Sequence, residues 1–477
     1  MITPTHTWER TLGKRASRPP RRRDAFAARR RPALVLLAAC ALLADPTTHA
    51  QQAGATSDAP YTLNEALRDA LERDPRIRAA GSRVQEAGEE FAEARALRFP
   101  TVNLTGGRGY GYNRNEARSI GIYEGDSRTS GLQVTQTVYS FGRIGARERE
   151  ARAMIEAAGF DAEDVRQSVQ RDAAVAYAEQ IYTRRILNRR IEFENLVAKQ
   201  ETSVREQLEL GRSDQTQVHE VLRYLHQARA QRIEADTAYR RAQYELARLT
   251  GAIRENLDAE GLGMLERVQP ETLDAARNLG LDGAPIAGKA RQSLVVARSR
   301  MEFQRSELWP QLELKLGGSE GYVGEIQTRD ADAQLMLRMP IFEGGRKFAR
   351  VRKARYAMEA AEYDLDADLE QLELNIVVSW NLVNGLAQAC EELERSLEDA
   401  GEIVSIVEEK LLVGRGTVLD QLEAEEIVAQ TDVTLLEKRM ELAQARVGLL
   451  RTLGTLRPAF VTRERGRPAL DNTQDVH

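Results

Sequence analysis

The chain has 477 residues and a formal net charge of -5, with 30% charged but only 5% aromatic residues. A composition of this kind suits long helices. Residues 1–50 carry a local charge of +7, so the rest of the chain has a net charge of -12. An acidic chain is a poor nucleic-acid binder, because phosphate contacts need clustered cations.

Residues 1–50 have the pattern of a secretory signal peptide. A basic stretch precedes a short apolar run over 33–44, and Thr48 and Ala50 supply the small residues of a cleavage site. The apolar run is too short for a transmembrane helix. Because the residues before Cys40 also resemble a lipobox, a lipid-anchored Cys40 is the alternative.

No catalytic, cofactor or metal-binding constellation is visible. His219 and His226 are seven residues apart on one predicted helix, about 10 Å along its axis, which is too far for a shared metal. The two cysteines give no disulfide framework, and Cys390 is expected to be a small buried side chain. We therefore expect no enzyme activity, no cofactor and no metal site.

Helix signals open the mature chain. Thr62 and Glu65 have the spacing of a capping box, and Asp74-Pro75 restarts the helix, since proline is accepted in a first turn. The helix is expected to end at Phe99-Pro100.

Two strand-like runs follow. Residues 101–112 place Val102, Leu104, Tyr110 and Tyr112 on one face, and a polar loop comes next. Residues 130–139 alternate again. One face holds Leu132, Val134 and Val138, and the other holds Gln133, Thr135 and Thr137.

Two very long helices are predicted from Gly142 to Leu210 and from Gly345 to Leu411. Each would span on the order of 100 Å at 1.5 Å per residue. Each ends at a glycine that suits a C-terminal cap, Gly211 or Gly414. A second helix follows each tip, so both halves form long antiparallel hairpins.

The helix after the second tip has coiled-coil spacing. Its heptad core positions run from Leu419 to Leu450 and are apolar except at Glu426. A steady alternation of three and four residues indicates helices that pack side by side.

The chain repeats itself with an offset of 203 residues. Gly142-Arg143 recurs as Gly345-Arg346, and the tip Gly211-Arg212 recurs as Gly414-Arg415. The second pair of strands holds Leu312, Leu314 and Leu316, then Ala333, Leu335, Leu337, Met339 and Ile341. We divide the chain into a signal peptide (1–50), a first repeat (51–251), a linker with short helices (252–285), a second repeat (286–456) and a disordered tail (457–477).

Strands of about ten alternating residues match the wall of an outer-membrane barrel. Four strands cannot close a barrel, because about eight is the smallest number known. The open edges must therefore pair with other copies of the chain.

These motifs together resemble those of the TolC-like outer-membrane factor family over about residues 60–455. The resemblance rests on the order and spacing of short motifs: Thr62 to Pro75, Phe99-Pro100 with Trp309-Pro310, Gln133 to Arg143, Pro340 to Arg346, and the tip from Val413 to Ala424.

The resemblance implies a mainly α fold with a small β part. Long antiparallel coiled-coil helices would form an α-barrel across the periplasm. Four strands per chain would contribute to a trimeric transmembrane β-barrel of twelve strands in the outer membrane. The implied partners are two further copies of the chain, outer-membrane lipid, a periplasmic adaptor protein and an inner-membrane pump, either an ABC exporter or a proton-driven pump.

The resemblance also assigns roles to the tips. Asp420 and Glu423 stand where the family carries acids that narrow the periplasmic mouth, although two acids on a solvated helix face are an equal alternative. Adaptor contact is expected at Gly211-Arg212-Ser213 and Gly414-Arg415-Gly416. Leu411, Gly416 and Gln217 replace the Tyr, Arg and Asp with which some members latch the tips shut.

Two functions compete on these grounds. The first is a passive exit duct of a tripartite export system, serving either drug efflux or type I protein secretion, and the second tip is closer to the secretion branch. The second is a periplasmic coiled-coil scaffold without a pore. The scaffold is disfavoured because a soluble rod has no use for four strands with apolar faces.

Overall fold

The computed structural model describes residues 60–114, 122–263, 269–323 and 326–456. All of these belong to one unit, Asp58–His477. The predicted signal peptide, the lipid-anchor alternative at Cys40 and the predicted tail over 457–477 lie outside the described residues.

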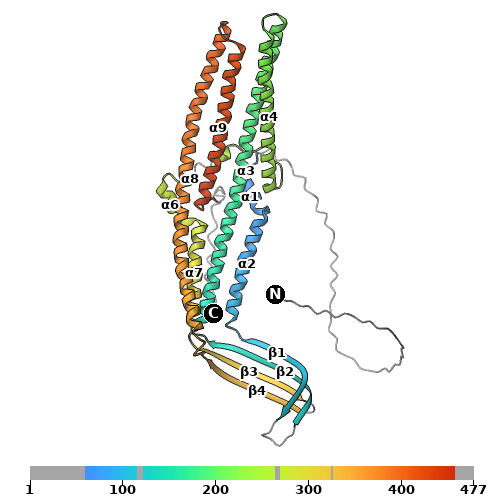
Figure 1. Ribbon diagram of the computed structural model, residues 1–477, viewed down its shortest axis with the longest axis vertical. Coiled ribbons are helices and arrows are strands. Elements are labelled where there is room, and N and C mark those ends of the chain that lie inside the picture. The colour runs from blue at the N-terminus through green and yellow to red at the C-terminus, as the bar shows by residue number, and fades with distance from the viewer. Residues whose placement is uncertain (1–59, 115–121, 264–268, 324–325, 457–477) are drawn as a thin grey trace, which may run out of the picture. The chain divides into compact units, whose positions relative to one another are not determined.

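The first half of the described chain contains four helices and two strands (Figure 1): α1 (Leu63–Arg73), α2 (Pro75–Ala96), β1 (Thr101–Arg114), β2 (Ile122–Tyr139), α3 (Arg143–Glu209) and α4 (Gln215–Thr250). A short connection holds η1 (Glu260–Gly263) and α6 (Leu273–Gly283). The second half follows with α7 (Pro285–Ser306), β3 (Gln311–Val323), β4 (Ile326–Arg338), α8 (Arg346–Leu412) and α9 (Val418–Thr452).

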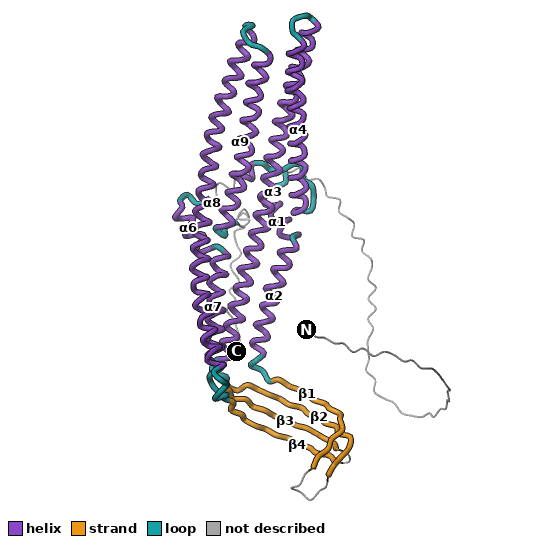
Figure 2. Tube along the Cα trace, viewed as in Figure 1, coloured by secondary structure: helices purple, strands orange, loops and turns teal. Residues whose placement is uncertain are grey.

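Helices and strands form one continuous wall (Figures 1 and 2). Helix α3 packs on α2 and α7, and α7 packs on α8, so the helices nearest the sheet run in the order α2-α3-α7-α8. The strands of the sheet lie in the order β1-β2-β3-β4. In the chain, β1 follows α2, β2 precedes α3, β3 follows α7 and β4 precedes α8, so strands and helices have the same order. Beyond the middle of α3 and α8, α4 and α9 take the places of α2 and α7.

Local chemistry confirms the predicted starts of α1 and α2, whereas α2 ends at Ala96, before the predicted Phe99-Pro100. Thr62 caps α1 in a capping box with Glu65, and Asp74 caps α2 with Pro75 in its first turn. Helices α3 and α8 are each 67 residues long, and each ends within one residue of its prediction. None of the helices in the described ranges has an apolar stretch long enough to cross a membrane.

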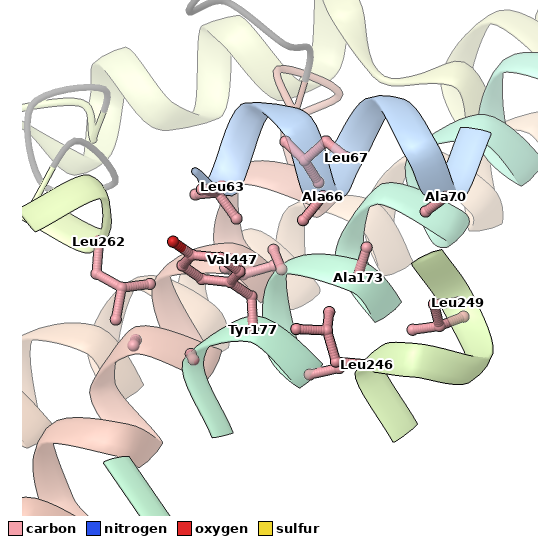
Figure 3. Close-up of a cluster of buried hydrophobic side chains, with 14 of the residues drawn as sticks. Leu63, Ala66, Leu67, Ala70, Ala173, Tyr177, Leu246, Leu249, Leu262 and Val447 are labelled. Atoms are coloured by element: carbon pink, nitrogen blue, oxygen red, sulfur yellow. The ribbon is translucent and has the colours of Figure 1, made fainter. Parts of the chain in front are cut away.

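The middle of the wall holds a tightly packed apolar cluster (Figure 3). Leu63 and Leu67 of α1 and Leu246 of α4 pack around Tyr177 of α3, which is fully buried. The Tyr177 hydroxyl donates to the carbonyl oxygens of Tyr61 at 2.7 Å and Asp258 at 2.8 Å. Burial raises the pKa of this phenol well above its usual range, so it stays protonated and fastens α3 to the connecting segments.

Helix α9 is buried on two sides. Seven of the ten predicted heptad positions are buried, among them Leu422, Val433 and Val447. A second buried stripe, Leu435, Leu442 and Leu449, recurs every seven residues and packs with Cys390, itself buried as predicted. The second stripe exists because α9 contacts both α3 and α8.

The predicted strand ends need correction. Strand β2 begins at Ile122 instead of residue 130, because its backbone pairs with β1 through residues that carry no apolar alternation. Strand β4 ends at Arg338 and leaves Met339 and Ile341 outside the ladder, because Pro340 has no N–H to donate. A register shift between Thr137 and Tyr139 removes Val138 from the predicted face.

Candidate functional site

The two hairpin tips share one hydrogen-bonded geometry. At the end of α3, Gly211 has a φ of 70°, and the Arg212 amide donates to the Gln207 carbonyl at 2.8 Å. At the end of α8, Gly414 has a φ of 73°, and the Arg415 amide donates to the Lys410 carbonyl at 2.8 Å. Both tips are therefore Schellman motifs that satisfy the last helical carbonyls and turn the chain back.

The helices that leave the tips begin with different caps. The Asp214 side chain accepts from the Gln217 amide at 2.9 Å to start α4. Thr417 starts α9, and its amide donates to the Asp420 carboxylate at 2.8 Å. Thr417 and Asp420 thus form a capping box. The Thr-x-x-Asp spacing is visible in the sequence, but neither the mouth nor the solvated helix face predicted for Asp420 includes a role as a cap.

The capping box gives Asp420 a structural role that competes with its predicted place at the mouth. Hydrogen bonds from Thr417 hold the pKa of the Asp420 carboxyl below its usual range, so the group is charged at neutral pH. Glu423 is exposed and lies one turn further along α9. Helix α9 therefore has two acids near its start: Asp420 is hydrogen-bonded to the tip, and Glu423 is exposed.

The offset of 203 residues identifies a matching pair in the first hairpin. Gln217 and Glu220 of α4 hold the positions of Asp420 and Glu423. Glu220 is a candidate mouth residue that our sequence reasoning missed, although applying the same offset would have revealed it. The Gln217 side-chain oxygen accepts from the Ser213 hydroxyl at 2.6 Å, so Gln217 is engaged within its own tip.

The two hairpins meet near their tips. Glu220 and Gln217 of α4 face the first turn of α9 across a cavity of about 110 Å³, which also touches α3. Nearby, the Gln200 amide of α3 donates to the Gln421 side chain of α9 at 3.1 Å. The tip residues Gly211, Arg212, Gly414 and Arg415 remain exposed, so they are accessible to a partner protein.

In the part of the sheet nearest the helices, one face is apolar and the other is polar. Directly paired residues of an antiparallel sheet lie on the same face. One face therefore carries an apolar patch across all four strands: Val102, Leu104, Leu132, Val134, Leu312, Leu314, Leu316, Ala333, Leu335 and Leu337. After the register shift, Tyr139 pairs with Leu312 and joins this face.

The opposite face of the sheet is polar. It carries Asn103, Thr105, Gln133, Thr135, Lys315, Asp332 and Gln334. On the apolar face, Leu104 is 82% exposed, and Leu335 and Leu337 are each 65% exposed. An exposed apolar patch of this extent marks a surface that is covered by lipid or by another chain.

Long paired helices continued by strands with one apolar face define a channel-forming protein of the outer membrane. The chain belongs to the outer membrane efflux protein family, whose model matches residues 66–252 and 281–455. It resembles the TolC-like branch of relatives, as predicted from the motifs.

Individual relatives agree with this assignment. The chain is 28% identical to the alkaline protease secretion protein AprF of Pseudomonas aeruginosa, over 75% of this chain and 77% of that protein. It is 23% identical to the outer membrane protein TolC of Vibrio cholerae, over 84% and 93%. The open state of the Neisseria gonorrhoeae outer membrane channel MtrE matches with a TM-score of 0.70 and 18% identity, over 83% and 89%.

Membership in this family confirms several predictions made from the sequence. The mainly α fold class with four strands per chain, the outer-membrane location and the assignment as a transport component instead of an enzyme are confirmed. A periplasmic scaffold without a pore has no support from these relatives.

Proposed function

We propose that the protein is the passive exit duct of a tripartite export system and that three copies form its channel. The observation that carries this proposal is the order of the wall. The four strands have the same side-by-side order as the four helices that adjoin them. Strands β1 and β4 form the two open edges of the sheet. Unpaired strand edges attract further strands, so repeating the chain extends the same wall.

The strand directions allow the wall to close on itself. Strands β1 and β3 lead away from the helices, and β2 and β4 lead back. Pairing β4 of one copy with β1 of the next therefore keeps every neighbour antiparallel. Three copies would supply twelve strands, a size within the range of closed outer-membrane barrels. Their apolar faces would meet lipid and their polar faces would line the passage.

The tips are the proposed periplasmic mouth. Asp420 and Glu423, with Gln217 and Glu220 at the matching positions of α4, would repeat around a threefold axis as stacked polar rings. Rings of carboxylates favour cations and slow anions. The tips Gly211-Arg212-Ser213 and Gly414-Arg415-Gly416 would contact a periplasmic adaptor protein, which would connect the duct to an inner-membrane pump.

We further propose that the cargo is protein and the pump an ABC exporter of a type I secretion system. The similarity to AprF, whose name states protease secretion, supports this choice over drug efflux. Deleting the gene should abolish secretion of the exported protein without changing the resistance of the cell to drugs. A change in drug resistance alone would instead favour efflux.

Assembly can be tested directly. Cross-linking in mild detergent should yield a limiting species of three chains, and the purified species should conduct ions in planar bilayers. A stable monomer or dimer, or a trimer that never conducts, would rule out the duct.

A further inference from the structure

Two neighbouring hollows lie where the helices meet the sheet. The larger, of about 760 Å³, is bounded by α3, α7 and α8, and its charged residues are Arg147, Glu150, Arg300, Arg350 and Lys353. The smaller, of about 220 Å³, reaches the first residues of β3 and the last of β4, and its charged residues are Arg143, Glu307, Arg338, Glu343, Arg346, Lys347 and Arg350. Arg350 lines both, so the two hollows form one surface.

This surface is strongly positive, although the chain as a whole is acidic. Eight cations and three carboxylates line it, an excess of five positive charges per chain. We call the eight cations the cationic zone: Arg143, Arg147, Arg300, Arg338, Arg346, Lys347, Arg350 and Lys353. The helix tips at the other end of α3 and α8 instead carry exposed acids such as Glu423.

Five of the eight cations of the zone make ion pairs, whereas Arg143, Lys347 and Lys353 make none with a described residue. Arg346 pairs with Glu343 at 2.8 Å, Arg350 with Glu307 at 3.7 Å and Arg338 with Glu313 at 3.9 Å. The side chain of Glu150 is only 3% exposed and accepts from both Arg147 at 2.9 Å and Arg300 at 2.6 Å. Arg143 donates to the neutral side chain of Gln311. Lys353 makes no ion pair with any residue in the described ranges. A field of positive charge therefore remains at the mouths of both hollows.

The zone lies on the polar side of the wall. Gln311 and Arg338 are register partners, and both line the smaller hollow. They share the sheet face of Lys315 and Gln334, opposite the apolar patch. In the proposed duct this polar face lines the passage, so the inference rests on the proposed function.

We propose that the cationic zone binds the carboxylates of acidic segments of a polypeptide as the cargo passes from the helical part of the duct into the strands. Guanidinium groups are planar forks that match carboxylates and bind them in two-point contacts. The cations extend across two hollows, which suits a chain with several carboxylates better than one small anion. Three copies would surround the passage with the same excess.

The test is block of single-channel current by a short poly-L-glutamate peptide, added on the side of the sheet. The double variant Arg143→Gln with Arg350→Gln should raise the half-blocking concentration about tenfold or more, because the local field attracts the polyanion. Lys353→Gln should give a smaller rise without freeing any acid, since Lys353 has no ion partner among the described residues. Poly-L-lysine should not block from this side.

The matched control is Arg152→Gln with Arg355→Gln, which removes one cation from each of the same two helices. Neither residue lines the hollows, and Arg355 pairs with Glu359 at 2.9 Å along α8. The control should keep the block of the unaltered channel. Conducting variants with an unchanged half-blocking concentration would overturn the binding zone and leave the duct standing. An unaltered trimer that carries no current would overturn both.

Discussion

Asp420 is tied to the first turn of α9 by its bond to the Thr417 amide, and Thr417 accepts from the Asp420 amide at 3.1 Å. Thr417→Ala removes this acceptor and should loosen the turn by about 1 kcal/mol. Amide hydrogen exchange of residues 418–421 should then become about fivefold faster. Thr417→Ser keeps the hydroxyl and should exchange like the unaltered chain. If Thr417→Ala and Thr417→Ser exchange at the same rate, the Thr417 hydroxyl does not cap α9.

The same cap should depend on pH. The folded-state pKa of Asp420 lies below its ordinary value, so the carboxylate stabilises the turn fully above about pH 3.9. This contribution is lost as the pH falls through the lowered pKa. Acid should therefore speed exchange at residues 418–421, after correction for the intrinsic rate. In Asp420→Asn the cap does not titrate, and this pH dependence should vanish.

Two glycines with positive φ allow backbone strain to be separated from crowding. A side chain at Gly414 would meet nothing within 4 Å, so Gly414→Ala should cost only the left-handed strain of about 1–2 kcal/mol. A Cβ at Gly454 would lie 2.6 Å from the Gly283 carbonyl oxygen, which is backbone and cannot move aside easily. Thermal unfolding in detergent should show the larger loss for Gly454→Ala. Equal losses would mean that the contact between residues 283 and 454 does not matter.

At the scale of the strands, we expect a charge to destabilise the channel on the apolar face of the sheet but not on the polar face. Leu335→Arg would place a charge on the apolar patch and should destabilise the assembled channel by about 2–4 kcal/mol. Met336→Arg is the matched control, because Met336 pairs with Glu313 on the polar face. Heat-induced dissociation of the trimer on gels measures both. A loss confined to Met336→Arg would mean that the faces are assigned the wrong way round.

The long elements were predictable, whereas their fine register was not. Glycines and heptad spacing are strong local signals, and α3 and α8 follow them within one residue. The start of β2 at Ile122 depends on backbone pairing, which leaves no side-chain pattern. The displacement of Val138 depends on the neighbouring strand β3 for the same reason.

The candidate sites also differ in how far the sequence alone predicts them. The tips could be found because each is one short stretch with a glycine cap. The cationic zone could not be found, because its members lie between Arg143 and Lys353 and only packing brings them together. The second stripe of α9, which includes Leu442, also required the position of α8.

At the scale of the whole channel, the acids of the proposed mouth predict its ion preference. Asp420→Asn with Glu423→Gln should abolish cation selectivity in planar bilayers and block by trivalent cations added on the side of the tips, since carboxylate oxygens are the ligands such ions prefer. Glu220→Gln alone should weaken both effects, because Glu220 holds in α4 the position that Glu423 holds in α9. The trimer should stay intact. Unchanged selectivity and block in the double variant would place the constriction elsewhere.

The two long helices can also be considered as levers. Each begins just after a pair of residues with positive φ, Phe141-Gly142 before α3 and Gly344-Gly345 before α8. These pairs lie outside the ladder of the sheet and would be the pivots of any rotation of the arms. At 67 residues each, the arms are on the order of 100 Å long. A rotation of about 3° at a pivot would carry a tip sideways by about 5 Å, roughly the pitch of one helical turn. Because the arms are equal, both tips would sweep the same arc, so one small rotation where the helices meet the sheet would move both tips by the same distance.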